Sequence, residues 1–364
     1  MNLRINYLTA GLTIFAMFFG AGNIFLPLAL SQQALDKTPW ALGGFLITAV
    51  GMPIAGLLAM FQFGGQIRLF FSRLGKIPGF CIAFLTIALL GPFGAAPRCI
   101  TLAHSTMSTS IPGLSLILFS GIACALVFCF TYKKNRLLKL IGYVLAPIKV
   151  TLLIWIIVKG FIDAPGTDLI SSNPSEVSHF WHGMKDGYMS MDLLAAFFFA
   201  PIIIASMTRT DDEKTLSRFV IKASAVGAFL LAAVYIGFCF LAYFYAAELQ
   251  GVSSEKLLGV IAIKVLGPHA GLLMSLTVCF ACLTTTIALI AAFANFLHKE
   301  VLKEKIGHIP VLMISLLTTF AVTTLEFQGI AHFLNPILTI CYPVLILLTF
   351  YNLIKPLPLT TIKE

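Results

Sequence analysis

The stretch Phe19-Gly20-Ala21-Gly22-Asn23-Ile24-Phe25-Leu26-Pro27 interrupts a segment, residues 7–30, that is otherwise apolar enough to cross a membrane. Glycine and proline here favour a break in the helix, and an unwound backbone exposes N–H and C=O groups that lipid cannot satisfy. Such groups bind ligands, because helix N-termini favour a carboxylate and freed carbonyls favour a small cation. We expect substrate to bind at Gly20, Ala21 and Gly22, where the small residues let it approach the main chain. Asn23 adds a side-chain oxygen suited to substrate and to a hard cation.

The rest of the chain is also too apolar for a water-soluble protein. Of its 364 residues, 59% are hydrophobic and 11% charged, whereas soluble domains have roughly half and about a quarter. Because one membrane helix needs roughly 20 apolar residues, the sequence predicts an all-α membrane protein with about ten transmembrane helices, forming a single domain over 1–364. The expected spans are 7–30, 40–63, 79–108, 114–131, 140–160, 186–207, 219–247, 270–297, 309–325 and 329–353. The first is too long for a signal peptide and is expected to be retained.

The net charge of +9 is explained by the positions of the basic residues, so no nucleic-acid partner is expected. With the N-terminus in the cytoplasm, 17 of the 24 Lys and Arg residues fall on the cytoplasmic side. Only 5 fall in the opposite loops or span ends. This excess predicts that both termini are cytoplasmic.

The spans divide into two sets of five, residues 7–160 and 186–353, and each set begins with a helix that contains breaking residues. In the sixth span these residues are Ala195-Ala196 and Ala200-Pro201, so we expect its break there. Since five is odd, the second set runs through the bilayer upside down relative to the first. Inverted halves with discontinuous first helices indicate a secondary transporter with its site near the midplane. The alternative is that glycine and proline are simply frequent in membrane helices.

Four motifs, in order along the chain, resemble the signatures of the branched-chain amino acid:cation symporter family. They are the 19–27 stretch, Gly91-Pro92-Phe93-Gly94-Ala95-Ala96-Pro97-Arg98, Leu145-Ala146-Pro147-Ile148-Lys149 and Asp186-Gly187-Tyr188-Met189-Ser190-Met191-Asp192, and Ala281-Cys282-Leu283 continues the likeness. The resemblance implies import of leucine, isoleucine and valine across a bacterial cytoplasmic (inner) membrane, coupled to Na⁺ or H⁺. It also implies the LeuT-type fold, a five-plus-five inverted repeat with broken first and sixth helices. This chain departs from the family in having about ten expected spans, whereas relatives generally have twelve. Because the last two spans are peripheral to the inverted repeats, the difference concerns oligomeric contacts more than transport.

The resemblance also implies a second cation site between the first and eighth spans. Ala281, Thr284 and Thr285 match the spacing of a small residue followed by two hydroxyl residues, and the facing carbonyls are those of Ala16 and Phe19. The alternative is that these hydroxyls only bond back to the carbonyl one turn earlier. Lys149 resembles the fifth-span lysine of proton-coupled members of the wider superfamily, whose ammonium replaces the second sodium. The alternative for Lys149 is a structural pair with a helix C-terminus.

Two further charges lie within the spans, where ionisable residues are usually functional. Asp192 is a candidate to bind the substrate ammonium, ligate a cation or carry a proton, and the alternative is a structural ion pair with Arg98. Arg98 is a candidate for the substrate carboxylate through its planar fork, or for an outer gate with Asp192. It can otherwise reach the headgroups from a helix end.

Phe197, Phe198 and Phe199 fall at the expected break of the sixth span, where one aromatic ring is expected to help form an apolar pocket for a branched side chain. Phe197 and Phe198 are the candidates for this ring. Such a pocket discriminates one methylene by only about 1–3 kcal/mol, so methionine is an expected further substrate. The sequence contains no H-E-x-x-H, G-x-S-x-G or Walker-type loop and predicts no enzyme, no metal site and no cofactor besides the transported ion. Another symporter of the same fold, or a channel with a continuous polar pore, is the alternative function. The expected partners are a small amino acid, Na⁺ or H⁺ and membrane lipid.

Overall fold

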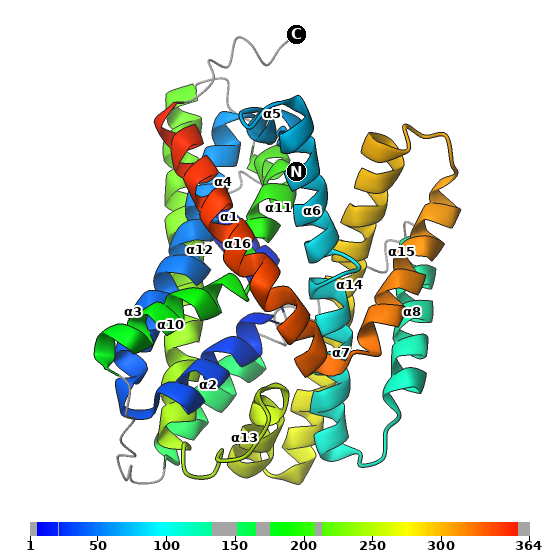
Figure 1. Cartoon of the computed structure of the whole chain (residues 1–364). Coiled ribbons are helices and arrows are strands. Elements are labelled where there is room, and N and C mark those ends of the chain that lie inside the picture. Colours follow the sequence, from blue (N-terminus) through cyan, green and yellow to red (C-terminus); the bar gives the residue numbers. More distant parts are fainter. Residues whose placement is uncertain (1–5, 21, 133–150, 165–174, 208–212, 356–364) are drawn as a thin grey trace.

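The computed structural model describes residues 6–20, 22–132, 151–164, 175–207 and 213–355, and in these ranges it contains helices and no strands (Figure 1). The predicted all-α architecture is confirmed. The helices are α1 (Tyr7–Phe18), α2 (Gly22–Ala34), α3 (Thr38–Leu46), α4 (Met52–Gln62), α5 (Ile67–Ser72), α6 (Lys76–Leu90), α7 (Ala95–Ser110), α8 (Leu116–Tyr132), Thr151–Ile162, α10 (Glu176–Tyr188), α11 (Asp192–Met207), α12 (Glu213–Phe244), α13 (Leu257–Leu266), α14 (Pro268–Phe296), α15 (His308–Thr323) and α16 (Glu326–Ile354).

Five helical stretches of the described chain are long and apolar enough to cross a membrane, and α10 with α11 forms a sixth, bent by 40°. The other apolar helices have 10–17 residues; they are α1, α8, Thr151–Ile162 and α15. Some of these stretches join two α-helices through a short segment of another helix type. One example is the π-helical segment Ile47–Gly51 between α3 and α4. The chain is therefore a multi-pass helical membrane protein.

The breaks between α1 and α2 and between α10 and α11 lie inside the bundle, where the residues beside them are buried. Helix α12 packs along α1 and α2, while α10 packs on α3 and α11 packs on α4. On the other side, α7 packs along α14, and α8 and α15 lie together at the edge (Figure 1). A Cβ atom added to Gly22 would lie 3.7 Å from the carbonyl oxygen of Ser190. The breaks in the first and sixth spans are therefore in contact.

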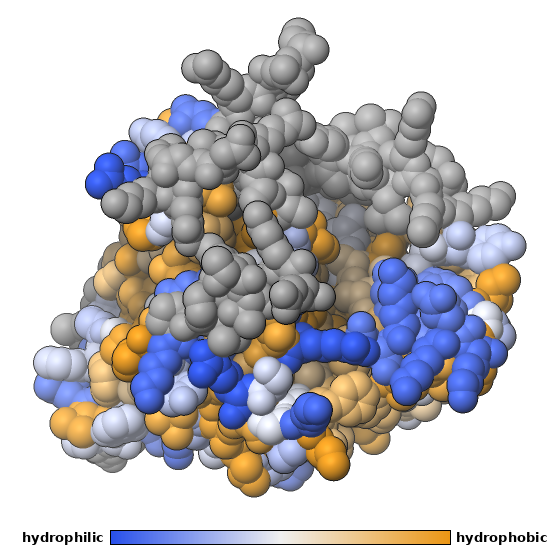
Figure 2. Space-filling view, turned by 90° about the horizontal axis from the view of Figure 1, so that it is seen from above, coloured by the Kyte–Doolittle hydropathy of each residue, from blue (hydrophilic) through white to orange (hydrophobic). Residues whose placement is uncertain are grey.

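One end of the molecule carries contacts among residues that the charge count assigns to the cytoplasm. Arg68 pairs with Glu300, and Arg73 donates to the carbonyl oxygen of Lys355 at 2.9 Å. The Lys222 ammonium lies 5.8 Å from the ring centre of Tyr7. Hydrophilic side chains lie among apolar ones on this face (Figure 2). The ends of α1, α12, α14 and α16 thus meet on one side, as the predicted topology requires, and the cellular orientation stays a prediction.

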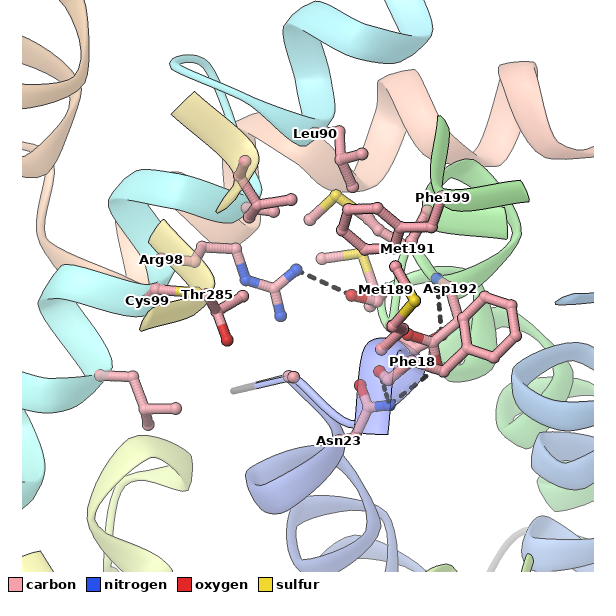
Figure 3. A pocket seen from close by; sticks show the side chains of 18 of the residues that line it. Phe18, Asn23, Leu90, Arg98, Cys99, Met189, Met191, Asp192, Phe199 and Thr285 are labelled. Carbon is pink, nitrogen blue, oxygen red and sulfur yellow. Dashed lines mark hydrogen bonds between the residues drawn. The ribbon is translucent and has the colours of Figure 1, made fainter. Parts of the chain in front are cut away.

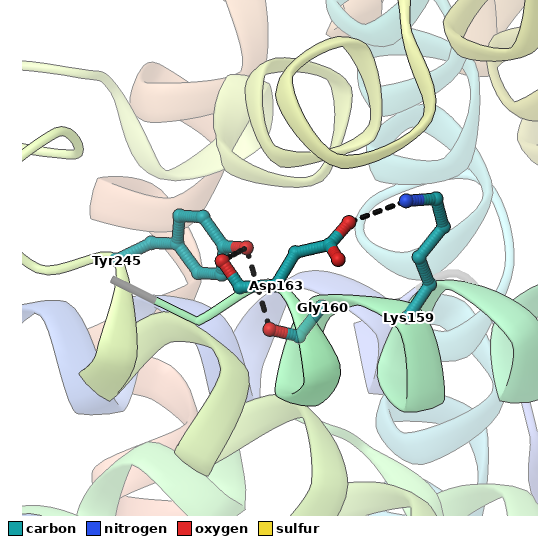
Figure 4. Close-up of polar contacts among 4 residues, drawn as sticks. All are labelled: Lys159, Gly160, Asp163 and Tyr245. Carbon is teal, nitrogen blue, oxygen red and sulfur yellow. Dashed lines mark hydrogen bonds and ion pairs between the residues drawn. The ribbon is translucent and has the colours of Figure 1, made fainter. Parts of the chain in front are cut away.

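At the opposite end, Tyr245 ties the segment after α12 to the end of helix Thr151–Ile162 (Figure 4). Its hydroxyl donates to the carbonyl oxygens of Gly160 and Asp163, each at 3.3 Å, and Lys159 pairs with Asp163. Burial, then the carboxylates of Asp163 and Glu248, raise the pKa of Tyr245. The hydroxyl therefore remains a hydrogen-bond donor at this surface.

Candidate functional site

The first break separates α1 from α2. The chain leaves helical geometry at Phe19, and the Gly20 N–H donates to the carbonyl oxygen of Phe18 at 2.7 Å. Asn23, only 1% exposed, donates from Nδ2 to the same carbonyl oxygen at 2.8 Å. The Asn23 amide thus donates a hydrogen bond to a main-chain carbonyl oxygen that the break exposes. Lipid could not supply such a donor.

The second break lies at residues 189–191, between α10 and α11, which corrects the position predicted from the sequence. Helix α11 runs without interruption through Ala195 and Pro201, because a helix in a packed membrane bundle tolerates proline. The chain turns instead at Met191, whose φ of 57° is in the left-handed region. The Ser190 hydroxyl supports the turn by donating to the carbonyl oxygen of Gly187 at 2.9 Å and accepting the Asp192 N–H at 3.3 Å.

Asp192 is the first residue of α11, where the positive end of the helix dipole favours a carboxylate. It is 3% exposed, and its Oδ2 accepts two hydrogen bonds. One comes from Asn23 Nδ2 at 3.0 Å (Figure 3). The other comes from the Tyr235 hydroxyl on α12, also at 3.0 Å. Asp192 therefore joins the two breaks to each other and to α12.

Arg98 lies on α7, which begins after a further break at residues 91–94 in the third span. A Cβ on Gly94 would lie 2.2 Å from the carbonyl oxygen of Leu89, so this turn requires glycine. Arg98 is 5% exposed, and its Nη1 donates to the carbonyl oxygen of Met189 at 2.8 Å (Figure 3). Its guanidinium also lies 5.3 Å and 5.7 Å from the ring centres of Phe25 and Phe327, a cation–π arrangement.

The alternatives considered for Arg98 and Asp192 are not realised in this conformation. No ion pair joins them; Asp192 bonds instead to Asn23 and Tyr235, and Arg98 to the Met189 carbonyl and two rings. Burial places the guanidinium inside the protein, so it does not extend to the headgroups. Two opposite charges are therefore buried near each other without neutralising each other, which is costly unless a ligand completes the site.

A cavity of about 50 Å³ lies between these groups. At about 10–15 Å³ for each water-sized group, it has room for a few such groups, comparable to the ammonium, α-carbon and carboxylate of an amino acid. It brings together six of the residues predicted from the sequence. They are Gly20, Gly22, Asn23, Arg98, Asp192 and Thr285.

The apolar part of the cavity is lined by Phe199, the last of the three phenylalanines at the expected break, and by side chains that the sequence interpretation did not select, including Met17 and Met191. The predicted Phe197 and Phe198 do not line it. Phe197 is fully buried against Phe70 and Phe71, with ring centres 4.9 Å and 5.4 Å away. Phe198 packs on Phe296. The ring at the cavity is one residue further along, because the break precedes α11 and changes which helix face looks inward.

The predicted second cation site is only partly described. The hydroxyls of Thr284 and Thr285 both donate to the Ala281 carbonyl oxygen at 2.9 Å, the local bonding considered as the alternative. Thr285 also lines the cavity, and its methyl would lie 3.7 Å from a Cβ on Gly20. Ala16 is exposed on α1, and the Phe19 side chain stacks on Phe15. Ala21 and Lys149 lie outside the described residues.

A second, wider cavity of about 630 Å³ lies between α10 and α16. Its polar lining consists of Asp186 together with Gln328, His332 and Asn335, which are spaced along one face of α16. Met189 lines both cavities. Among the described residues, no group of three or more His, Cys, Asp or Glu side chains is placed to hold a metal ion.

Comparison with known proteins places these features in context. The family model described as "Branched-chain amino acid transport protein" matches residues 3–361. The branched-chain amino acid permease BrnQ of Bacillus subtilis (strain 168) is 30% identical over 351 residues, covering 93% of this chain and 79% of the relative. The permease of the same name from Corynebacterium glutamicum is 28% identical, covering 96% and 81%.

Two solved structures show the fold. The inward-facing conformation of Mhp1 has a TM-score of 0.66 at 15% identity, covering 95% of this chain and 76% of that one. The manganese transporter of Eremococcus coleocola, in complex with an aromatic bis-isothiourea compound, has a TM-score of 0.63 at 12% identity, covering 95% and 78%. These likenesses confirm the predicted LeuT-type architecture.

Proposed function

The chain belongs to the branched-chain amino acid transport protein family, and from this premise we propose that it imports leucine, isoleucine and valine by symport with Na⁺ or H⁺. The family consists of transporters, so the chain is a transporter and not an enzyme. The proposed setting is a bacterial cytoplasmic membrane with both termini in the cytoplasm. The proposed mechanism is alternating access around the cavity between the two breaks.

The observation that carries this proposal is the pair of buried, opposite charges at one cavity. Arg98 and Asp192 are 5% and 3% exposed, line the same cavity and do not pair with each other. A zwitterionic α-amino acid is complementary to this arrangement, because its carboxylate suits the guanidinium fork and its ammonium suits the Asp192 carboxylate. Binding of the amino acid then neutralises both buried charges at once, whereas binding of an uncharged solute would neutralise neither.

The apolar lining supports a branched aliphatic side chain. Met17, Met191, Phe199 and Leu289 are apolar side chains that line the same cavity as the two charges. Methionine side chains adapt their shape readily, so we expect the pocket to widen from its present volume to hold the three or four carbon atoms of these side chains. A methylene contributes only about 1–3 kcal/mol to discrimination, and methionine is therefore proposed as a further substrate.

For the coupling ion, the proposal keeps both Na⁺ and H⁺. Asn23 supplies an amide oxygen beside Asp192, and Thr285 supplies a hydroxyl oxygen at the cavity. A hydroxyl that donates to a carbonyl retains lone pairs for a cation, so its bond to Ala281 is compatible with a sodium ligand. Lys149 is the proposed alternative to a second sodium in a proton-coupled cycle.

The test is leucine uptake and counterflow in proteoliposomes, with the Na⁺ and pH gradients imposed independently. We expect leucine to accumulate against its gradient with at least one of the two ions, and isoleucine and valine to compete. Accumulation of leucine under neither gradient would contradict the proposal. Single-channel currents in planar bilayers would favour the channel alternative, and accumulation of a solute that leucine does not inhibit would favour another substrate.

A further inference from the structure

One oxygen atom of Asp192 connects three separate parts of the fold. Its Oδ2 accepts from Asn23 on α2 and from Tyr235 on α12, each at 3.0 Å, while Asp192 itself begins α11. Asn23 also bonds to the carbonyl oxygen of Phe18 at the end of α1. The position of this carboxyl group is thus set by both breaks and by a continuous helix beside them.

Tyr235 is the member of this network that lies on an unbroken helix. Its side chain is fully buried, and its ring packs on Phe45 with centres 5.2 Å apart at an angle of 69°. Helix α12 packs along α1 and α2. The Tyr235 hydroxyl is therefore held by a rigid support and is one residue removed from the cavity, which it does not line.

The two hydrogen bonds leave the carboxyl group asymmetric. A carboxylate oxygen has two lone-pair positions, and Asn23 and Tyr235 together occupy those of Oδ2. The Ser190 hydroxyl lies beside the group, where it accepts the Asp192 N–H at 3.3 Å and donates its own proton to the carbonyl oxygen of Gly187. Oδ1 is consequently the atom that remains for an incoming cationic group. No basic side chain of the described residues forms an ion pair with Asp192.

We propose that Tyr235 is a positioning residue for substrate recognition: its hydroxyl fixes Asp192 so that Oδ1 faces the ammonium of the amino acid. This inference rests on the proposed function, because it presumes an amino acid in the cavity. It assigns to α12 a role in selecting substrates that carry an α-ammonium group. Tyr235 acts through Asp192 and does not itself touch the substrate.

The test is Tyr235→Phe, which removes one hydroxyl and keeps the ring that packs on Phe45. Loss of a hydrogen bond to a charged group predicts that the KM for leucine rises about tenfold. The discriminating readout is inhibition of leucine uptake by 2-hydroxy-4-methylpentanoate, which has the leucine skeleton and carboxylate but no ammonium. We expect its inhibition constant to stay within about twofold of wild type.

Tyr245→Phe is the matched control. It removes a buried hydroxyl that makes two hydrogen bonds just beyond the end of the same helix, away from the cavity. We expect it to leave the KM for leucine unchanged. The rise in unfolding temperature that leucine causes in detergent gives a second readout, since ligand stabilisation follows affinity. We expect Tyr235→Phe to reduce this rise and Tyr245→Phe to preserve it.

Equal weakening of leucine and of the hydroxy acid in Tyr235→Phe would show a merely structural role and overturn the inference. So would a KM and a leucine-induced stabilisation that both match wild type. Failure of the wild-type protein to take up or be stabilised by any amino acid would instead overturn the proposed function, and the positioning role with it.

Discussion

The two breaks at the site are built differently, although they face each other across one cavity. The α1–α2 break uses Gly20 and Gly22, neither of which has a positive φ, and a side-chain amide closes the end of α1. The α10–α11 break contains no glycine and places Met191 at a φ of 57°. A non-glycine residue in this region costs about 1–2 kcal/mol, so the second break is strained at Met191, whereas no described residue of the first break has a positive φ.

Because the two breaks are built differently, they contribute different features to the site. Both glycines line the cavity, and a Cβ on Gly20 would take up space there in ordinary contact with Thr285, at 3.7 Å, so the glycine leaves that space and its main chain to a ligand. The strained turn at Met191 fixes the direction from which α11 starts, and with it the Asp192 carboxyl group. The first break therefore provides room, and the second provides a charge. Variants at each break are expected to fail in different ways.

The largest effect is expected from removing the charge at the second break. In Asp192→Asn the side chain keeps its size, but the substrate ammonium has no carboxylate to compensate it. Truncating one partner of a buried charge pair costs about 2–5 kcal/mol, so leucine uptake at low concentration should fall by at least about thirtyfold. Initial rates of leucine uptake in vesicles, normalised to protein content, measure this loss.

Asp163→Asn is the control for the Asp192 prediction, because Asp163 pairs with Lys159 at the end of the molecule remote from the cavity. It should transport leucine at the wild-type rate. Uptake by Asp192→Asn within about threefold of wild type would show that the ammonium is bound elsewhere.

The contrast between the breaks also explains how far the sequence could predict the site. Glycines and Pro27 mark the first break, and the predicted Gly20, Gly22 and Asn23 do lie at the cavity. The second break was misplaced, because Pro201 suggests an interruption that the packed helix absorbs, while a methionine at positive φ leaves no signal in a single sequence. Phe199, instead of Phe197 or Phe198, lines the cavity for the same reason.

Tyr235 could not be selected from the sequence at all. It is one of nine tyrosines and lies on a helix without breaks, 43 residues from the aspartate that it contacts. Long-range contacts of this kind depend on how α12 packs against α1 and α2. Arg98 and Asp192 were recognisable as intramembrane charges, whereas their lack of mutual pairing depends on side-chain partners that only the structure defines.

A smaller effect is expected from filling the space at the first break. In Gly20→Ala the added methyl meets only ordinary contacts and points at the cavity that Gly20 lines. We expect the KM for leucine to rise about tenfold, the equivalent of about 1.4 kcal/mol, while the unfolding temperature stays within about 2 °C of wild type. Uptake kinetics and thermal unfolding of the same preparation measure the two quantities.

Gly183→Ala is the contrasting variant for the Gly20 prediction. Its Cβ would lie 1.9 Å from the carbonyl oxygen of Ala41, so it should lower the unfolding temperature. A Gly20→Ala protein that unfolds as early as this control would show that Gly20 is needed for packing and not for room.

The smallest effect concerns the strain at the second break. Met191 is 2% exposed, so both Met191→Ala and Met191→Gly lose the burial of a methionine side chain, and their difference isolates the backbone. Since glycine adopts a positive φ without penalty, Met191→Gly should be more stable than Met191→Ala by about 1 kcal/mol in denaturant unfolding. At Ala195, inside α11, the order should reverse, because glycine in a helix costs about 1 kcal/mol relative to alanine. If alanine were the more stable choice at both positions, residue 191 would not be held in the left-handed region in the folded protein, and the second break would not be strained there.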